Sequence, residues 1–214
     1  MELRLKLADE DIAANPYDLD AWLDKAGILE DLGREDEALQ CYDTMISIDP
    51  KDTGAWKNKG ILLYRLARIK ESLYCYEMAL TIDFQDPISW NGKGMALSKL
   101  DRLQDALYCY DMVIAIDPKD NLGWLNKGVL LHDLGQLDDA LQCYDKALEI
   151  NPKDELAMYN KGTTLCLLGR KSEALRFLET AIKINPGLKR MLLNDKALAP
   201  FLENMRFRNR LGIR

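Results

Sequence analysis

The sequence has little of what enzyme and metal sites most often require. Its 214 residues include a single histidine, His132, so no metal cluster or catalytic dyad that needs two histidines can form. There is no glycine-rich phosphate loop, and neither the His-Glu-x-x-His nor the Gly-x-Ser-x-Gly motif occurs. Carboxylates are abundant, but they fall at expected helix caps and solvated faces and form no convergent pair. These absences predict a protein that is not an enzyme and that holds no cofactor and no metal.

Long apolar segments are missing as well. The opening residues, MELRLKLADEDIA, are acidic where a signal peptide needs an unbroken apolar segment, and no run approaches the length of a transmembrane helix. The net charge of −6 and the pI of about 5.0 argue against general affinity for nucleic acid. We therefore expect a soluble, cytoplasmic protein, and we expect neither nucleic acid nor a membrane as its partner.

What the sequence does contain is a tryptophan that recurs every 34 residues, at Trp22, Trp56, Trp90 and Trp124. The stretch 121–154 around the last of them reads Trp-x2-Lys-Gly-x2-Leu, then Ala-x3-Tyr at Ala140 and Tyr144, then Pro152. A period of this size is typical of stacked repeat proteins. The stretch resembles the tetratricopeptide repeat (TPR), a helix–turn–helix unit with the same period and the same types of anchor residue.

The resemblance implies an all-α fold, a right-handed α-solenoid of stacked TPR helix–turn–helix units with capping helices. The register predicts an N-terminal half-repeat at residues 1–18, which supplies only a second helix, and basic capping helices at residues 189–214. The half-repeat is either a cap or the remnant of a longer solenoid. Between these ends the register predicts five full repeats, which we number one to five: 19–52, 53–86, 87–120, 121–154 and 155–188.

The residues at the repeat boundaries support this register. Each repeat follows an aspartate, and aspartate is a favoured N-cap because its carboxylate accepts a hydrogen bond from the first turn of a helix. Repeat two departs from the pattern, since Ala67, Ser72 and Phe84 replace a glycine, an alanine and a proline. We therefore expect repeat two to be the loosest joint of the series. The predicted N-caps are Asp18, Asp52, Asp86, Asp120 and Asp154.

Cysteines also follow the repeat, at Cys41, Cys75, Cys109 and Cys143. Neighbouring repeats are about 10 Å apart, whereas a disulfide bridges Cα atoms at most about 7 Å apart. We interpret these four cysteines as buried, reduced thiols that act as small apolar side chains, which agrees with a cytoplasmic location. Cys166 lies elsewhere, on a first helix, and is predicted to be the more reactive thiol.

In TPR proteins the first helices line a concave groove, so the resemblance implies which side chains face a ligand. Here they combine an apolar strip with asparagines that recur at one place in the repeat. Asparagine both donates and accepts hydrogen bonds, which suits an extended peptide, and an apolar strip suits an amphipathic helix. The predicted groove residues are Lys57, Asn58, Ile61, Tyr64, Arg65, Ile88, Asn91, Met95, Leu122, Leu125, Asn126, Val129, His132, Leu156, Tyr159 and Asn160.

One known TPR class clamps a C-terminal carboxylate, as in chaperone tails, with Lys-x3-Asn, Asn and Lys-x3-Arg in successive repeats. Asn58 matches the middle asparagine, but Leu23, Gly27, Ile88 and Gly92 occupy the flanking places. We therefore do not expect a chaperone tail as the ligand. A row of lysines beside the glycine position is interpreted as stems packed between repeats with solvated heads: Lys25, Lys59, Lys93, Lys127 and Lys161.

The leading hypothesis is a scaffold or adaptor that binds a peptide or helix of a partner protein in the groove. The alternative is a self-assembling structural module, in which the acidic body of one copy receives the basic C-terminus of another. Its mass would then rise with concentration and fall with salt. A third hypothesis gives the C-terminal arginines an anionic partner such as RNA or lipid headgroups, although a solvated cap is the favoured interpretation of Arg206, Arg208, Arg210 and Arg214.

Overall fold

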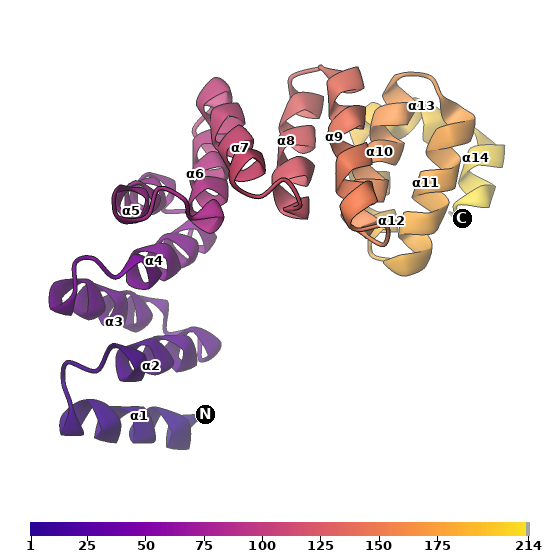
Figure 1. The fold of residues 1–214 in the computed structure, drawn as a ribbon. Helices are drawn as coiled ribbons and strands as arrows, with labels where there is room; N and C mark the ends of the chain where they lie inside the picture. The colour runs from indigo at the N-terminus through magenta and orange to yellow at the C-terminus, as the bar shows by residue number, and fades with distance from the viewer. Residues whose placement is uncertain (213–214) are drawn as a thin grey trace. The chain divides into compact units, whose positions relative to one another are not determined.

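The computed structural model describes residues 1–212, except the side chains of Lys196, Met205 and Arg206. Every regular element in this part of the chain is a helix, which confirms the predicted all-α fold of repeating helix pairs (Figure 1). From α2 to α11, helices of 13 residues alternate with helices of 14 residues. In chain order the helices are α1 (Glu2–Ala14), α2 (Leu19–Asp31), α3 (Glu35–Ile48), α4 (Thr53–Arg65), α5 (Ile69–Ile82), α6 (Pro87–Lys99), α7 (Leu103–Ile116), α8 (Asn121–Asp133), α9 (Leu137–Ile150), α10 (Glu155–Leu167), α11 (Lys171–Ile184), α12 (Leu188–Asn194), a 3-10 turn (Lys196–Leu198), α13 (Ala199–Leu202) and α14 (Met205–Arg210).

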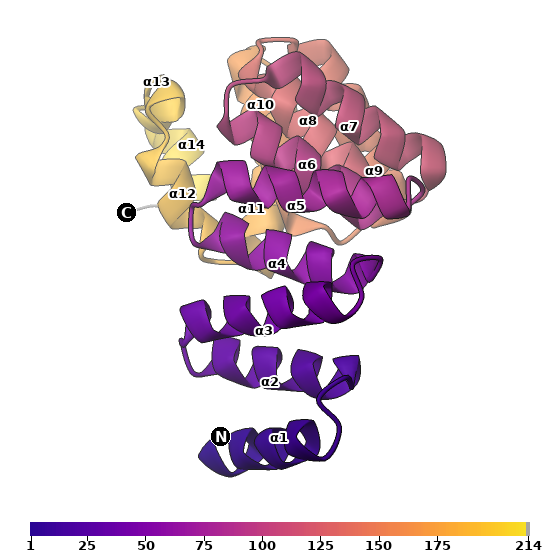
Figure 2. The same cartoon turned by 90° about the vertical axis from the view of Figure 1, so that its left-hand side faces the viewer.

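By their contacts the helices fall into two halves, Met1–Met112 and Val113–Arg214, and the boundary between them falls within α7. In the first half, each helix from α1 to α6 packs against the next one in the chain, and Figures 1 and 2 show this order. In the second half, the helices from α8 to α11 are arranged in the same way. Each half therefore contains stacked helix pairs of its own.

The five predicted aspartate N-caps all cap a first helix. Asp52, for example, accepts hydrogen bonds from the backbone N–H groups of Gly54 at 2.8 Å and Ala55 at 3.3 Å. These bonds satisfy donors that the first turn of a helix leaves without an intrahelical partner. The first helices therefore begin where local side-chain chemistry places them. The other four caps accept bonds from the first turns of their own helices: Asp18, Asp86, Asp120 and Asp154.

The turn after each first helix holds one residue in the left-handed region of backbone space. Glycine takes this place in three repeats, at Gly33, Gly135 and Gly169, with φ between +69° and +76°. In repeats two and three the same place holds Ala67, with φ of +58°, and Asp101, with φ of +60°. A residue with a Cβ is strained there by about 1–2 kcal/mol, and aspartate tolerates the conformation better than alanine does. The turn that contains Ala67 is therefore the most strained of the five.

Replacing Ala67 by glycine is expected to raise the free energy of unfolding by about 0.5–1 kcal/mol. Glycine relieves the strain of the left-handed conformation, and the larger conformational entropy of glycine in the unfolded chain offsets part of that gain. Urea titration followed by circular dichroism measures the change. The reverse substitution at the equivalent turn, Gly33→Ala, should lower the free energy of unfolding, and a gain in both variants would contradict the interpretation.

The other two irregular residues of repeat two make contacts that compensate for them. The hydroxyl of Ser72 is fully buried and donates a hydrogen bond of 2.7 Å to the carbonyl of Gly60, so the serine leaves no unsatisfied polar group between α4 and α5. The ring of Phe84 packs edge-on against Trp90, with ring centroids 5.2 Å apart. Of the three irregular residues in repeat two, Ala67 is therefore the one whose cost is not offset by a new contact.

The lysine row connects consecutive repeats by ion pairs. The ammonium of Lys25 lies 2.7 Å from Asp9, and that of Lys93 lies 3.2 Å from Glu77. Lys59 with Asp43 and Lys161 with Asp145 form the same pair, always sixteen residues apart. Each of these four lysines thus pairs with an acidic residue on the preceding second helix, and α1 supplies that residue for repeat one. The heads are paired as well as solvated, and partly exposed pairs of this kind contribute about 0–1 kcal/mol each.

The helices after repeat five cover its apolar side. Leu192 of α12, Leu198 of the 3-10 turn and Phe207 of α14 are buried in one cluster with residues of α10 and α11. On the outside, Arg210 pairs with Glu179 of α11 at 2.6 Å. Of the C-terminal arginines, Arg214 lies outside the described residues, as does the side chain of Arg206.

Candidate functional site

The predicted groove residues lie on first helices that pack beside each other within each half. In the first half these helices are α4 and α6, and in the second half they are α8 and α10. The spacing of the residues places most of them along one side of each helix, as expected for positions three or four apart. The structure therefore brings the predicted residues together within each half.

In the first half, the charged groove residues already bind neighbouring helices. The ammonium of Lys57 on α4 lies 3.2 Å from the carboxylate of Asp86, the N-cap of α6. Arg65 lies 2.6 Å from Glu30 of α2, and Glu30 also accepts a hydrogen bond of 2.6 Å from the hydroxyl of Tyr42. These contacts position α2, α4 and α6 relative to each other, so the two cations have structural roles.

The other predicted groove residues of the first half have apolar, amide or phenol side chains. Ile61 and Ile88 are exposed, and Asn58, Tyr64 and Met95 are half-buried. The amide of Asn91 lies 3.6 Å from the sulfur of Met95, one turn further along α6. This face of α4 and α6 therefore offers exposed isoleucines beside polar amides.

The second half repeats this combination. Leu122 on α8 is 55% exposed and Leu156 on α10 is 43% exposed, while Asn126, Val129 and Asn160 are half-buried. The same place in the repeat therefore carries an exposed apolar residue on both first helices. The side chains of Leu122 and Leu156 therefore contribute little to the core of this half.

Two predicted groove residues of the second half are buried. Leu125 and Tyr159 are each 5% exposed, and Tyr159 belongs to the apolar cluster beneath the C-terminal helices. They lie beneath the surface of α8 and α10 and offer almost no area to a ligand. Burial of Tyr159 also raises the pKa of its hydroxyl to about 12.

His132 is held in one orientation by a residue that the sequence did not single out. Its Nδ1 atom lies 2.7 Å from the hydroxyl oxygen of Thr164, which is fully buried. The hydroxyl of Thr164 donates to the carbonyl of Asn160 at 2.7 Å, so the histidine Nδ1–H is the donor in the first contact. In the tautomer with the proton on Nδ1, the Nε2 atom of His132 carries a lone pair that can accept a hydrogen bond. Nothing in the sequence marked Thr164 as the partner of His132.

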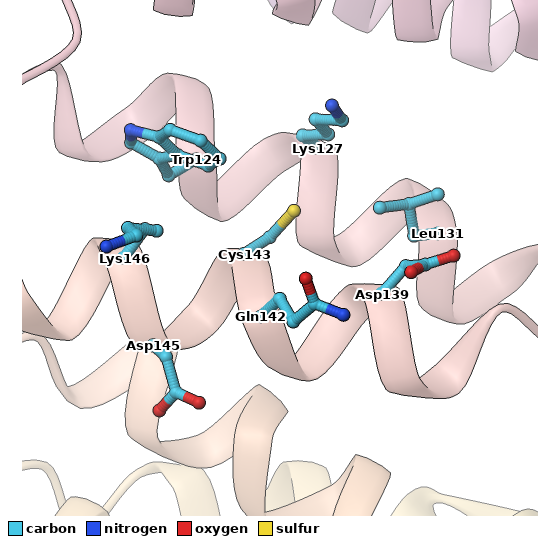
Figure 3. A pocket seen from close by; sticks show the side chains of 8 residues that line it. All are labelled: Trp124, Lys127, Leu131, Asp139, Gln142, Cys143, Asp145 and Lys146. Carbon is cyan, nitrogen blue, oxygen red and sulfur yellow. The ribbon is translucent and has the colours of Figure 1, made fainter.

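A pocket that sequence reasoning missed lies between α8 and α9, with a volume of about 450 Å³. Figure 3 shows Trp124 at one end of it, Asp139 at the other end, and Gln142 and Cys143 between them. The indole N–H of Trp124 donates to the carbonyl of Pro118 at 3.1 Å, which fixes the ring. The sequence contains one indication of this pocket, which is that Gln142 stands where repeats two and three have tyrosine.

The prediction of a reactive thiol at Cys166 is wrong. All five cysteines, which lie within the described residues, are buried and free of disulfide bonds. Cys166 has no exposed surface, and burial raises the pKa of its thiol to about 12. The apolar surroundings of α10 and α11 decide this, and position on a first helix does not. Burial likewise raises the pKa of Cys75 and of Cys109 to about 11.

Within residues 1–212, no group of three or more histidine, cysteine, aspartate or glutamate side chains is placed to hold a metal ion. None of the described helices has the length and apolar character needed to cross a lipid bilayer.

The fold and its first-helix faces define a helical-repeat protein. The sequence matches the tetratricopeptide repeat family at residues 19–62, 87–120, 122–154 and 143–176. The chain therefore belongs to the TPR family, whose members are typically non-enzymatic scaffolds for protein interaction. No curated protein matches the sequence as a whole.

Solved structures of other TPR proteins have the same fold. The crystal structure of YrrB, described as a TPR protein with an unusual peptide-binding site, is 24% identical and has a TM-score of 0.66, with 92% of this chain and 98% of that chain covered. MamA of Desulfovibrio magneticus RS-1 is 16% identical with a TM-score of 0.69, covering 79% and 96%. PilF of Pseudomonas aeruginosa is 16% identical with a TM-score of 0.77, covering 91% and 87%. At these identities the likeness shows the fold alone.

Proposed function

We propose that this protein is a non-enzymatic scaffold or adaptor that binds a peptide or a helix of a partner protein along its first helices. Membership of the TPR family supports interaction with proteins as the general role. The described residues add the chemistry of the surface on which we expect the partner to bind. The ligand class, an extended peptide or an amphipathic helix, follows from that chemistry.

One observation carries the proposal. Ile88, Leu122 and Leu156 occupy the same place in repeats three, four and five, and each is at least 43% exposed. A large apolar side chain that recurs at an exposed place gains nothing from the core, and such surfaces mark sites of protein interaction. Burial of these side chains against a partner would release water from apolar surface and stabilise the complex.

Polar groups beside these residues suit a peptide backbone. Asn126 and Asn160 lie one turn along from Leu122 and Leu156, and both are half-buried. Their amides donate and accept hydrogen bonds, as does a peptide group. The acceptor Nε2 of His132 lies on the same helix as Asn126 and is suited to a backbone N–H. We therefore favour a ligand whose backbone contacts α8 and α10.

The charged groups of the first half argue against an acidic peptide tail as the ligand. Lys57 is paired with Asp86 and Arg65 with Glu30, so neither cation is left over to clamp a carboxylate. This agrees with the lack of the carboxylate-clamp residues in the sequence. By contrast, YrrB is a relative in fold that is described as having a peptide-binding site, which supports a peptide as the ligand.

The double substitution Leu122→Asp/Leu156→Asp is expected to abolish the capture of specific partners. Aspartate removes the apolar surface and adds two charges that a partner would have to desolvate. Affinity purification from native lysate, with captured proteins quantified against wild type, measures the effect, and we expect a loss of about tenfold or more. Because both side chains are exposed, the helical circular dichroism signal should not change.

The matched control is Ile184→Asp. Ile184 is 47% exposed at the end of α11, a second helix, and so tests the same chemical change outside the first helices. This variant should capture the same proteins as wild type. Retention of the partners by the double variant, or their loss in the control as well, would contradict binding along α8 and α10.

Self-assembly through the acidic body and the basic C-terminus remains the alternative. Within the described residues, Arg210 binds Glu179 and the ammonium of Lys189 lies 3.3 Å from the carbonyl of Gly212, so part of the basic segment already contacts its own chain. For this reason we place a separate partner protein first. We also propose the cytoplasm as the location, because five buried thiols suit a reducing compartment.

A further inference from the structure

The pocket between α8 and α9 lies on a different side of α8 from the proposed groove. With 3.6 residues per turn, Leu122 and Asn126 share one side of the helix, whereas Trp124 and Lys127 lie on the other. The pocket is lined by Trp124 and by side chains of the second helix α9, and it has a volume of about 450 Å³ (Figure 3). It is therefore a second candidate surface, independent of the first-helix face.

Repeats two and three show what normally fills this pocket. Tyr74 packs edge-on against Trp56, with ring centroids 5.9 Å apart and an interplanar angle of 78°. Tyr108 packs in the same way against Trp90, at 5.8 Å and 80°. Both tryptophans are buried, at 8% and 5% exposure. In these repeats the chain covers its own tryptophan with a tyrosine ring.

Repeat four has lost this cover. Gln142 lies 34 residues after Tyr108 and so occupies the tyrosine place, and Trp124 is only half-buried. Repeat one has the same combination, because Gln40 takes the tyrosine place and Trp22 is also half-buried. In repeats one to four the tryptophan is buried where this place holds tyrosine and half-buried where it holds glutamine, and at Trp90 the ring of Phe84 packs against the indole as well. The space left at Trp124 corresponds to an aromatic ring that repeat four does not supply.

Repeat four also lacks the arginine that the other repeats have at the start of the second helix. At the start of the second helix in the other four repeats, an arginine pairs with an acidic residue three places later: Arg34 with Glu37, Arg68 with Glu71, Arg102 with Asp105, and Arg170 with Glu173. In repeat four the arginine place holds Gln136, and Asp139 makes no ion pair with any described residue. The carboxylate at this end of the pocket is therefore unmatched.

Three other charged side chains line the pocket, Lys127, Asp145 and Lys146, and none of them is without a partner. Lys146 lies 2.7 Å from Glu149 on the same helix, and Asp145 pairs with Lys161 of α10. Asp139 is thus the acidic group that a partner can still match. The pocket combines a half-buried indole ring with one unmatched negative charge.

From these observations we infer that the repeat-four pocket docks an aromatic side chain of a partner protein, next to a basic residue that pairs with Asp139. The partner ring takes the place that Tyr74 and Tyr108 occupy in their own repeats, packed edge-on against Trp124. The partner's cation takes the role of the missing arginine. Repeat four is the one repeat that lacks both groups, since repeat one retains the Arg34–Glu37 pair and repeat five has Met158 in place of tryptophan.

The test is a titration of the full chain with the blocked dipeptide acetyl-Arg-Tyr-amide, followed by the NMR signals of the four tryptophan indole N–H groups. The signal of Trp124, assigned by its loss in Trp124→Phe, is expected to shift with a dissociation constant of about 1 mM, while those of Trp56 and Trp90 stay in place. A shift of all four signals together, or none up to about 20 mM, would overturn the proposal.

The decisive variant is Gln142→Tyr, which rebuilds the cover found in repeats two and three. It is expected to weaken binding of the dipeptide by about tenfold or more and to leave the melting temperature unchanged or raised, because it copies a side chain that the fold already accommodates. The matched control Gln40→Tyr makes the same change in repeat one and should leave binding at Trp124 unaltered. If a folded Gln142→Tyr variant bound the dipeptide as tightly as wild type, the proposal would be wrong.

Two further dipeptides test the chemistry of the partner. Acetyl-Arg-Ala-amide lacks the ring and should not shift the Trp124 signal. Acetyl-Glu-Tyr-amide reverses the charge that faces Asp139 and is expected to bind about threefold or more weakly. Equal binding of the ring-free peptide would overturn the aromatic anchor, and equal binding of the glutamate peptide would overturn the role of Asp139.

Discussion

Replacing Tyr144 by alanine is expected to lower the free energy of unfolding by about 4 kcal/mol, one of the two largest effects that we predict. Tyr144 is fully buried in repeat four, and a ring carbon lies 2.6 Å from the place where Gly128 would carry a Cβ. The ring therefore fills space that glycine leaves between α8 and α9, and its removal opens a cavity there. Urea titration followed by circular dichroism measures the loss.

Tyr144→Phe separates the ring from its hydroxyl. The hydroxyl of Tyr144 forms a hydrogen bond with Thr164, and burial raises the pKa of this tyrosine. Removing the hydroxyl alone should lower the free energy of unfolding by about 1 kcal/mol, as is usual for one buried hydrogen bond. A loss as large as that of the alanine variant would show that the hydrogen bond, and not the packing of the ring, holds this part of the fold.

Gly162→Val is expected to lower the free energy of unfolding by about 3 kcal/mol, for the opposite reason. A Cβ at Gly162 would lie 2.7 Å from Cγ of Leu178 and 3.3 Å from its backbone nitrogen. Leu178 is fully buried and cannot turn aside without displacing its neighbours. The added side chain therefore forces α10 and α11 apart. The same urea titration measures the effect.

Gly27→Val is the matched control, because it makes the same substitution inside the first helix α2. No atom outside that helix segment lies within 4 Å of a Cβ built at Gly27. Valine also has a somewhat higher helix propensity than glycine, so the free energy of unfolding should change by less than about 0.5 kcal/mol. If both variants lost the same stability, the cause would be the backbone and not the contact with Leu178.

The order and the bounds of the helices were predictable from the sequence because the determinants are local. The tryptophan period of 34 residues sets the register, and an aspartate such as Asp52 caps its helix through backbone groups two and three residues away. The turn at Gly135, where φ is +76°, needs only a glycine at that one position. Interactions over so few residues leave a clear trace in the sequence.

The first-helix face was predictable in part. Residues three and four apart on a helix share a side, so the spacing placed Leu122 and Asn126 together without a structure. The structure adds that Leu122 is exposed while Leu125 and Tyr159 are buried. Helical spacing states which side of a helix a residue is on, but the exposed fraction depends on what the neighbouring helices cover.

The sequence by itself determined the repeat, the helix pairs and the sides that they present, because each depends on contacts within one repeat or on its period. The tertiary structure alone decided that Cys166 is inert, that Lys57 and Arg65 are engaged by acidic residues of neighbouring helices, and that space remains beside Trp124. These properties depend on burial and on empty volume. Both are set by side chains far apart in the chain, and a single sequence carries no direct record of how closely those side chains approach.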